Sequence, residues 1–150
     1  MASEAPIKVT VAIPTYNRAD FLRQALAGIV AQQFPRDHLE ILVIDNNSCD
    51  HTPAVVAEFA AAKPVPRHVL EPRQGLGHAR NRAIAEARGD IIVFGDDDIL
   101  VEPDWLAQIV VPLLAVLFAS ATATAAAATA EEVHEFDVVR VVREDVVNGG

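Results

Sequence analysis

The chain has 150 residues, of which 51% are hydrophobic, a size that suits one domain around one core. Its formal net charge of −9 argues against the clustered Lys and Arg surface that a nucleic-acid partner requires, so we expect no nucleic-acid binding. Cys49 is the only cysteine, which excludes an intrachain disulfide, and the N-terminus lacks the basic start and apolar stretch of a signal peptide. These features predict a cytoplasmic protein.

Short apolar runs alternate with segments of helical spacing along residues 7–117. This pattern predicts an α/β fold, a Rossmann-like three-layer α/β/α arrangement around a mainly parallel sheet. The first strand is expected over residues 7–13 and is expected to stop at Pro14, which cannot donate to a sheet ladder. A helix follows, because apolar residues then repeat at intervals of three and four up to Val30.

Two further strands are expected on either side of a short helix. Residues 41–44 are apolar throughout, as in a strand covered on both faces, and residues 68–70 form a shorter candidate. Between them, Thr52 and Pro53 predict the N-cap and the first position of the helix, which closes before Pro64.

Gly75 and Gly77 predict a flexible turn into a third helix that stops at Gly89, and residues 91–94 predict the fourth strand. Pro103 is expected to open a fourth helix. The inward positions are expected to be Leu76, Ala79, Ala83, Ile84 and Ala87 in the third helix, and Leu106, Ile109, Val110, Leu113, Leu114 and Leu117 in the fourth.

The composition changes after residue 118, which divides the chain into a domain of residues 1–118 and an atypical or truncated part of residues 119–150. That second part is Ala/Thr-rich and then Val-rich, and one strand is expected at residues 136–142. Residues 105–130 carry no charged side chain and are long enough to span a bilayer, but Pro112 and the Ala/Thr content weigh against a spanning helix. Peripheral membrane contact is the alternative for this segment.

Polar clusters follow three of the expected strands, at the ends where an open parallel sheet binds its ligands. They are the loop Pro14-Thr15-Tyr16-Asn17-Arg18, the cluster Asp45-Asn46-Asn47-Ser48 and the triplet Asp96-Asp97-Asp98. We therefore expect one pocket to collect all three.

The acidic triplet places three adjacent carboxylates together, and these repel one another unless a cation lies close. Oxygen ligands favour Mg²⁺ or Mn²⁺, and either ion neutralises charge that develops on a departing diphosphate. The other interpretation is a solvated acidic turn that caps the helix at Pro103.

Asp45 and its neighbours carry the acceptors and amide donors that suit a nucleobase edge, and Tyr16 is placed to stack on a base or contact ribose. An Asx-rich turn is the alternative for that cluster. Arg73, Arg80 and Arg82 lie on or before the third helix, where they either hold a phosphate or are simply solvated.

The segments VAIPTYNRADFLRQAL, ILVIDNNSCDHT and GLGHARNRAIAEARGDIIVFGDDDILVEPDWL occur in this order. The ordered set resembles the family 2 glycosyltransferases of the GT-A fold over residues 7–117. The resemblance implies an inverting enzyme that uses a nucleotide-diphosphate-sugar donor, and implies that this chain is mainly its N-terminal, donor-binding part.

By this resemblance, Asp96 and Asp98 would be the family's DxD pair, with Asp98 the preferred metal ligand and Asp96 the second. The residues then expected to bind the nucleotide sugar are Pro14, Thr15, Tyr16, Asn17, Arg18, Asp45, Asn46, Asn47, Arg80, Asp96 and Asp97.

The chain departs from the family after Leu117, where members continue with an acceptor-binding region and, in inverting enzymes, a carboxylate base. Glu144 and Asp145 are the candidates for that base, and the catalytic residue is otherwise unassigned. Trp105 is expected either to border an acceptor pocket or to pack on the sheet. The five histidines lack metal-ligand spacing and are expected to be ordinary surface or loop residues.

The leading prediction is a glycosyltransferase that moves a sugar from its donor to a hydroxyl of an unknown acceptor, which is a saccharide, a lipid-linked molecule or another alcohol. A catalytically incomplete nucleotide- and metal-binding module is the alternative. Two further classes use strand-end acids in the same way: a nucleotidyltransferase, which usually has a Gly-rich basic loop after its first strand, and a phosphoacceptor domain that binds Mg²⁺ without a nucleotide.

Overall fold

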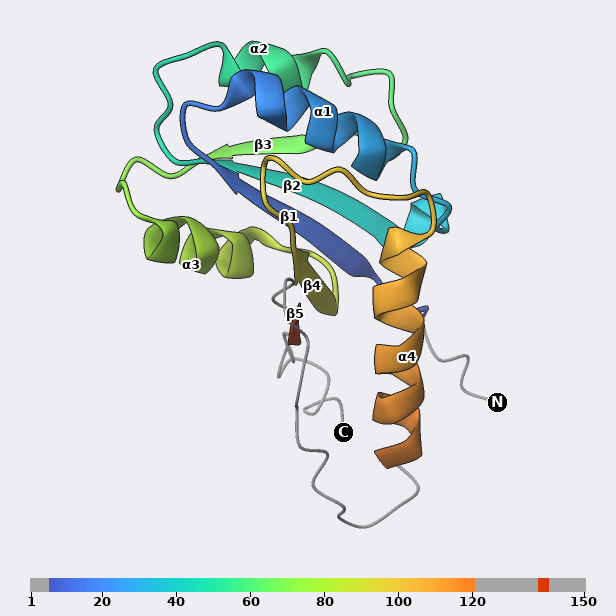
Figure 1. Ribbon diagram of the computed structural model, residues 1–150. Helices are drawn as coiled ribbons and strands as arrows, with labels where there is room; N and C mark the ends of the chain where they lie inside the picture. The colour runs from blue at the N-terminus through green and yellow to red at the C-terminus, as the bar shows by residue number, and fades with distance from the viewer. Residues whose placement is uncertain (1–5, 121–137, 141–150) are drawn as a thin grey trace.

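A computed structural model of the chain describes residues 6–120 and 138–140. A five-stranded sheet in the order β3-β2-β1-β4-β5 forms the middle layer, with helices on both faces (Figure 1). Four strands are parallel and β5 is antiparallel to β4, so the expected three-layer α/β/α class is confirmed. The strands are β1 (Val9–Thr15), β2 (Leu39–Asp45), β3 (Arg67–Leu70), β4 (Ile91–Phe94) and β5 (Val138–Arg140); the helices are α1 (Ala19–Val30), α2 (Thr52–Ala57), α3 (Leu76–Glu86) and α4 (Trp105–Ser120), with one 3-10 turn at Arg36–His38.

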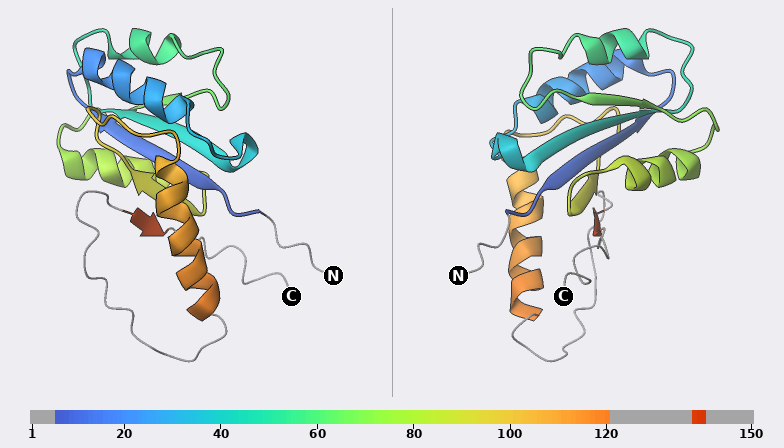
Figure 2. Two further views of the ribbon diagram at one scale, coloured as in Figure 1. Left: turned by 45° about the vertical axis from the view of Figure 1, so that its right-hand side comes forward. Right: turned by 180° about the vertical axis from the view of Figure 1, so that it is seen from behind.

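The core is divided between the two faces of the sheet. The helices α1 and α2 and the start of α4 pack on one face, where Leu22, Val55 and Leu106 are buried. Of the helices in residues 6–120, α3 is the one on the opposite face, where Ala79 and Ala83 pack against strand residues (Figure 2). Full burial of a Leu or Val side chain contributes about 1.5–3 kcal/mol, so these contacts fix the helices against the sheet.

The strand β1 continues through Pro14 to Thr15, so the prediction that it stops at Pro14 is wrong. The carbonyl of Ala12 accepts the backbone N–H of Gly95 on the β4 side, and that of Thr15 accepts the N–H of Asn46 on the β2 side. Successive residues of a strand bond to opposite neighbours, so the missing N–H of Pro14 lies on the β4 side. The pairing with β4 ends at Ala12, and no ladder bond is lost.

The helix α3 buries Ala79 and Ala83 as expected, but the prediction that Leu76 and Ile84 point inward is wrong. Leu76 is 61% exposed and Ile84 is 38% exposed. The two buried alanines are four residues apart and therefore lie on the same face of the helix, the face that packs on the sheet. Ile84 is rotated from this face by about a third of a turn, and Leu76 is the first residue of the helix, so both side chains are exposed. Gly77 is a helical residue and not part of the turn.

The helix α4 begins at Trp105 and not at Pro103, because Gln32 supplies the cap: its Oε1 accepts the backbone N–H of Leu106 at 2.9 Å. It then runs through Pro112 without a break in the helix, and its second half extends beyond the sheet (Figure 2). Within the part of the chain that the structure describes, no helix combines the length and the apolar character needed to cross a bilayer.

The strand expected at residues 136–142 is present as β5 (Val138–Arg140). The rest of the tail, with Glu144 and Asp145, lies outside the described residues. The helix α4 ends at Ser120, two residues beyond the expected boundary, and the division at residue 118 stays a prediction.

Candidate functional site

A pocket of about 600 Å³ opens at the carboxyl ends of β1 and β4. The chain passes from β1 outward to β2 and β3 and then returns to place β4 on the other side of β1, so the crossovers diverge between β1 and β4. The wall residues are Pro14, Thr15, Tyr16, Arg18, Asn46, Gln74, Gly75, Leu76, Ala79, Asp96, Asp97 and Asp98. All three strand-end clusters therefore contribute to one pocket.

The middle acid of the triplet is anchored inside the fold, while the outer two are exposed at the pocket. The hydroxyl of Thr15 donates to Asp97 Oδ2 at 2.8 Å. The guanidinium of Arg18 donates from Nη1 to Asp97 Oδ1 at 2.9 Å and from Nη2 to Asp98 Oδ2 at 3.0 Å. Burial raises the pKa of the Asp97 carboxyl, an effect that the Thr15 hydroxyl and the Arg18 charge oppose.

Within residues 6–120 and 138–140, no three His, Cys, Asp or Glu side chains are grouped so as to hold a metal ion by themselves. Asp96 and Asp98 nevertheless both line the pocket with exposed carboxylates. Mg²⁺ and Mn²⁺ are commonly held by one or two carboxylates, with phosphate oxygens and water completing the shell. The carboxylates of Asp96 and Asp98 therefore fit a divalent ion whose other ligands are diphosphate oxygens and water.

Asn46 uses its side chain to hold the loop that follows β3. Its Oδ1 accepts the backbone N–H of Gly75 at 2.8 Å. Its Nδ2 donates to the carbonyl of Glu71 at 3.1 Å and to that of Arg73 at 2.8 Å. Both amide hydrogens are used in these bonds, so Asn46 shapes the pocket wall and has only an acceptor lone pair left for a ligand.

Asp45, Asn17 and Asn47 are not on the pocket wall. Asp45 is buried: its Oδ1 accepts the backbone N–H of Ser48 at 2.8 Å, and its Oδ2 lies 3.0 Å from His68 Nε2. Asn17 and Asn47 have positive φ values of 52° and 66° and turn the two loops. Asp45 and Asn47 therefore lie in an Asx-rich turn, which was the alternative interpretation of the Asp45 cluster.

The three arginines on or before α3 are also off the pocket wall. Arg73 donates from Nε to Glu71 Oε1 at 2.8 Å, and Arg82 pairs with a glutamate four residues further along α3. The guanidinium of Arg80 lies 5.2 Å from the centroid of the Phe94 ring. Each of these cations has a contact within the protein, and the arginine at the pocket is Arg18.

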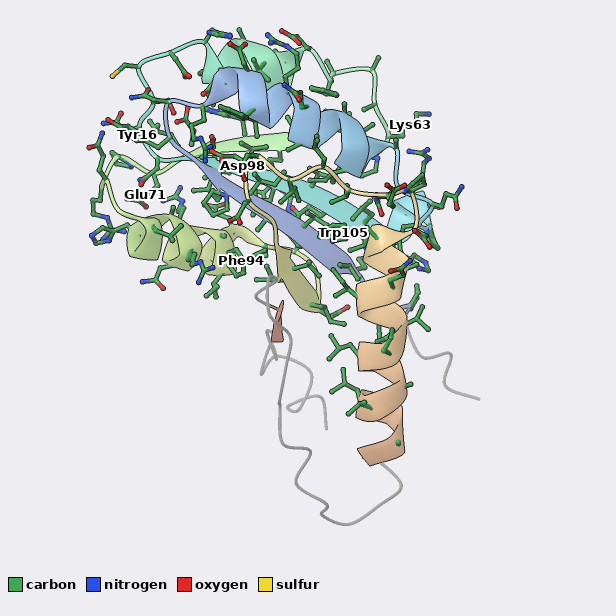
Figure 3. All side chains as sticks on the ribbon, viewed as in Figure 1. Tyr16, Lys63, Glu71, Phe94, Asp98 and Trp105 are labelled. Carbon is green, nitrogen blue, oxygen red and sulfur yellow. The ribbon has the colours of Figure 1, made fainter. Side chains whose placement is uncertain are left out.

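The sequence interpretation expected a turn at Gly75 and a candidate phosphate ligand at Arg73, but it did not identify Gln74, Gly75 and Leu76, in the loop after β3 and at the start of α3, as part of the pocket wall. Glu71 is buried in this loop and, with Tyr16, lies at the same end of the sheet (Figure 3). The side chain of Arg73, together with its backbone N–H, lowers the pKa of Glu71 to about 2. Gly75 has a φ of 136°, which favours glycine, and it brings Leu76 to the pocket. The pairing of β3 with β2 was the missing information, because it puts this loop at the pocket edge.

The structure also places Trp105 and His68, two residues for which the sequence made specific predictions. Trp105 is buried in the core cluster under α1 and lies away from Tyr16 and Glu71 (Figure 3), so its packing role is confirmed and an acceptor contact is not seen. His68 is an exposed residue of β3, so the surface position expected for it is confirmed, but its Nε2 also lies 3.0 Å from Asp45 Oδ2, a contact that the sequence did not indicate.

The parallel sheet, its flanking helices and the acid-lined pocket at the strand ends define a glycosyltransferase domain of the GT-A fold. The sequence pattern described as Glycosyl transferase family 2 matches residues 10–141, and the chain belongs to this family.

Several relatives share the sequence and the fold. Glycosyltransferase AglE of Haloferax volcanii is 35% identical over 107 residues, which is 71% of this chain and 35% of AglE. The mannosyltransferase PcManGT of Pyrobaculum calidifontis, solved with GDP-Man and Mn²⁺, superposes with a TM-score of 0.65 at 38% identity, over 71% of this chain and 32% of that one. TarS of Staphylococcus aureus, solved with UDP-GlcNAc, superposes with a TM-score of 0.64 at 27% identity, over 70% of this chain and 30% of that one.

The chain thus spans about a third of the length of AglE and of both solved structures.

Proposed function

We propose that the chain is the donor-binding part of a glycosyltransferase that moves a sugar from a nucleotide-diphosphate sugar to an acceptor hydroxyl with inversion. The observation that carries this proposal is the pocket between β1 and β4, which has Asp96 and Asp98 on its wall together with Tyr16. The solved relatives with GDP-Man and Mn²⁺ or with UDP-GlcNAc support this choice of ligand, since they share the fold of this chain and are 38% and 27% identical to it in sequence.

The pocket offers different chemistry to the parts of such a donor. Tyr16 and Leu76 present exposed apolar surface to a base or a ribose. Arg18 adds a guanidinium next to the carboxylates, where it can donate to diphosphate oxygens. Asp97 is held by Thr15 and keeps its two neighbours at the pocket.

Asp98 and Asp96 are the residues that would hold Mg²⁺ or Mn²⁺, which would neutralise the charge that grows on the diphosphate as it leaves the sugar. The acceptor, whether a saccharide, a lipid-linked molecule or another hydroxyl compound, is not selected by these residues. Glu144 and Asp145 stay the candidates for the base. Cytoplasmic location and peripheral membrane contact also stay predictions.

A specific observation favours the second candidate function, an incomplete binding module. Among the described residues, the pocket wall has no carboxylate outside the triplet that would deprotonate an acceptor hydroxyl. In this alternative the chain binds nucleotide and metal but needs a partner for transfer.

Calorimetric titration with GDP and UDP, each with and without Mn²⁺, tests both functions. We expect metal-dependent binding that is lost in Asp98→Ala and retained in Asp104→Ala, an exposed acid that is not on the pocket wall. Sugar-nucleotide hydrolysis or transfer that is also lost in Asp98→Ala would identify an enzyme, whereas binding without turnover would identify a binding module. Absence of binding to either nucleotide with Mn²⁺ present would contradict both.

A further inference from the structure

The guanidinium of Arg18 bridges the carboxylates of Asp97 and Asp98 at the pocket, and these two contacts differ in their exposure to solvent. The side chain of Asp97 is only 7% exposed, and its second oxygen is held by Thr15. The side chain of Asp98 is 44% exposed and is held by Arg18 Nη2 at 3.0 Å. The contact with Asp98 is therefore the one that water and ions reach, and exposed ion pairs of this kind contribute little free energy.

The side of the Arg18 guanidinium that faces Asp98 is placed to move without disturbing the fold. Arg18 directly precedes α1, its side chain makes no capping hydrogen bond to that helix, and its side chain is 43% exposed. Its guanidinium carbon lies 4.8 Å from the centroid of the Phe21 ring, which is itself half exposed. Loss of the Nη2 contact with Asp98, with Nη1 kept on Asp97, therefore exchanges a surface contact only.

We propose that Arg18 is a resident counter-cation of the acidic triplet that gives up Asp98 when a divalent ion and a nucleoside diphosphate bind. The inference rests on the proposed metal and nucleotide site. A divalent ion on the Asp98 carboxylate would lie close to the guanidinium, and the repulsion between the two cations disfavours keeping the contact between Arg18 and Asp98. Arg18 then keeps Asp97, and its released Nη2 donates to diphosphate oxygens in the pocket that it already lines.

This exchange has two consequences of opposite sign. Without nucleotide, Arg18 opposes metal binding, because the ion must break the contact with Asp98 and approach a positive charge. With the diphosphate present, Arg18 favours the bound state, because its charge faces phosphate. Metal and nucleotide affinities are therefore coupled through one side chain, and each ligand strengthens binding of the other.

The test measures Mn²⁺ binding to Arg18→Gln, Arg18→Lys and the unaltered chain by electron paramagnetic resonance of free Mn²⁺, and UDP and GDP binding at saturating Mn²⁺ by calorimetry. Arg18→Gln is expected to bind Mn²⁺ alone about three- to tenfold more tightly, the scale of an exposed ion pair and a neighbouring like charge, and to bind the diphosphate more weakly. Arg18→Lys keeps the charge but lacks the forked guanidinium that bridges two carboxylates. Its affinities for Mn²⁺ and for the diphosphate are therefore expected to lie between those of Arg18→Gln and of the unaltered chain.

Arg88→Gln is the matched control, because it removes one positive charge at the opposite end of the sheet, where Arg88 lines a separate pocket. The proposal is overturned if Arg18→Gln binds Mn²⁺ no more tightly than Arg88→Gln, or if it weakens both ligands together, as a purely structural role would. If Arg18→Gln does not fold, a side-chain nuclear magnetic resonance signal of Arg18 that stays unchanged when Mg²⁺ and UDP are added to the unaltered chain overturns it equally. Failure of every variant and of the unaltered chain to bind Mn²⁺ with nucleotide would instead overturn the proposed metal site.

Discussion

The side-chain oxygen of Asn46 accepts the backbone N–H of Gly75 at 2.8 Å and so ties the end of β2 to the loop that forms one wall of the pocket. The same side chain donates to the carbonyls of Glu71 and Arg73. An amide is required here, because a carboxylate would place negative charge against two carbonyl oxygens. The wall of the proposed donor site therefore depends on this asparagine.

The first prediction concerns Asn46→Asp. The change removes both N–H donors and leaves the carbonyls of Glu71 and Arg73 facing a carboxylate, so we expect a loss of about 3 kcal/mol in the free energy of unfolding. We also expect weaker nucleoside-diphosphate binding, because the loop that carries Gly75 is released. Urea unfolding and calorimetry with UDP and Mn²⁺ measure the two effects.

Asn47→Asp is the control for that prediction, since it makes the same chemical change at the next, exposed residue. Asn47 has a φ of 66°, a conformation that Asp also tolerates. We expect a change within about 0.5 kcal/mol. Equal losses for the two variants would show that added charge, and not the broken loop contacts, is responsible.

The second prediction compares two glycines. A Cβ at Gly89 would lie 2.6 Å from the backbone nitrogen of Thr10, which cannot retreat because it belongs to β1. Gly89→Ala is therefore expected to cost about 2 kcal/mol or more in unfolding free energy. At Gly77, on α3, an added Cβ meets nothing within 4 Å. Gly77→Ala is expected to stabilise the protein by about 0.5–1 kcal/mol.

Thermal melting of both glycine variants in parallel is the measurement. A Gly89→Ala protein as stable as the unaltered chain would contradict the close approach of this turn to β1. A destabilised Gly77→Ala would contradict the helical conformation of Gly77 in α3.

The third prediction concerns the acid sensitivity of the pair Glu71 and Arg73. The folded pKa of Glu71 is lowered to about 2, first by the Arg73 side chain, from an ordinary value of 4.5. A group whose pKa is lowered on folding stabilises the protein above its unfolded pKa and loses that contribution as the pH falls through the folded value. The contribution of Glu71 is therefore complete above about pH 4.5 and disappears towards about pH 2.

Glu71→Gln should accordingly be less stable than the unaltered chain at neutral pH, and the difference should shrink as the pH falls between about 4.5 and about 2. Urea unfolding at a series of pH values measures this difference. Glu102→Gln, an exposed acid away from the pocket wall, serves as the reference for general acid effects. A difference that stays constant across the acid range would contradict the role of the ionised pair.

Much of the fold was predictable because apolar runs and the helical spacing of apolar residues are local features of the sequence. The apolar run at β4 (Ile91–Phe94) agrees with the expected position. The helix α2 begins at Thr52 with His51 as its N-cap, one residue before the predicted N-cap at Thr52 and first position at Pro53. The errors occur where a neighbouring element overrides the local signal. Gln32 of the adjacent turn caps α4 at Leu106, and Pro14 stays within β1 because β4 is too short to require its N–H.

The candidate site was predictable in part, for a related reason. Strand-end clusters were visible in the sequence, and Thr15, Asn46 and Asp97 do reach one pocket. Asp45 has the hydrogen-bond acceptors expected of a base-binding residue, but it is buried against His68. That contact forms only because β3 pairs with β2.

The sequence by itself determined the alternation of strands and helices, the position of the acids at strand ends, and the membership of glycosyl transferase family 2. These features depend on the periodicity of apolar residues and on the order of short motifs, which can be read along the chain without knowledge of its folding. Only the tertiary structure decided which side chains meet. Arg18 reaches Asp97 across 79 residues because β1 lies between β2 and β4, and the same arrangement brings the loop at Gly75 to Asn46. Such partners depend on which strand ends become neighbours when the sheet assembles, and no local spacing specifies that choice.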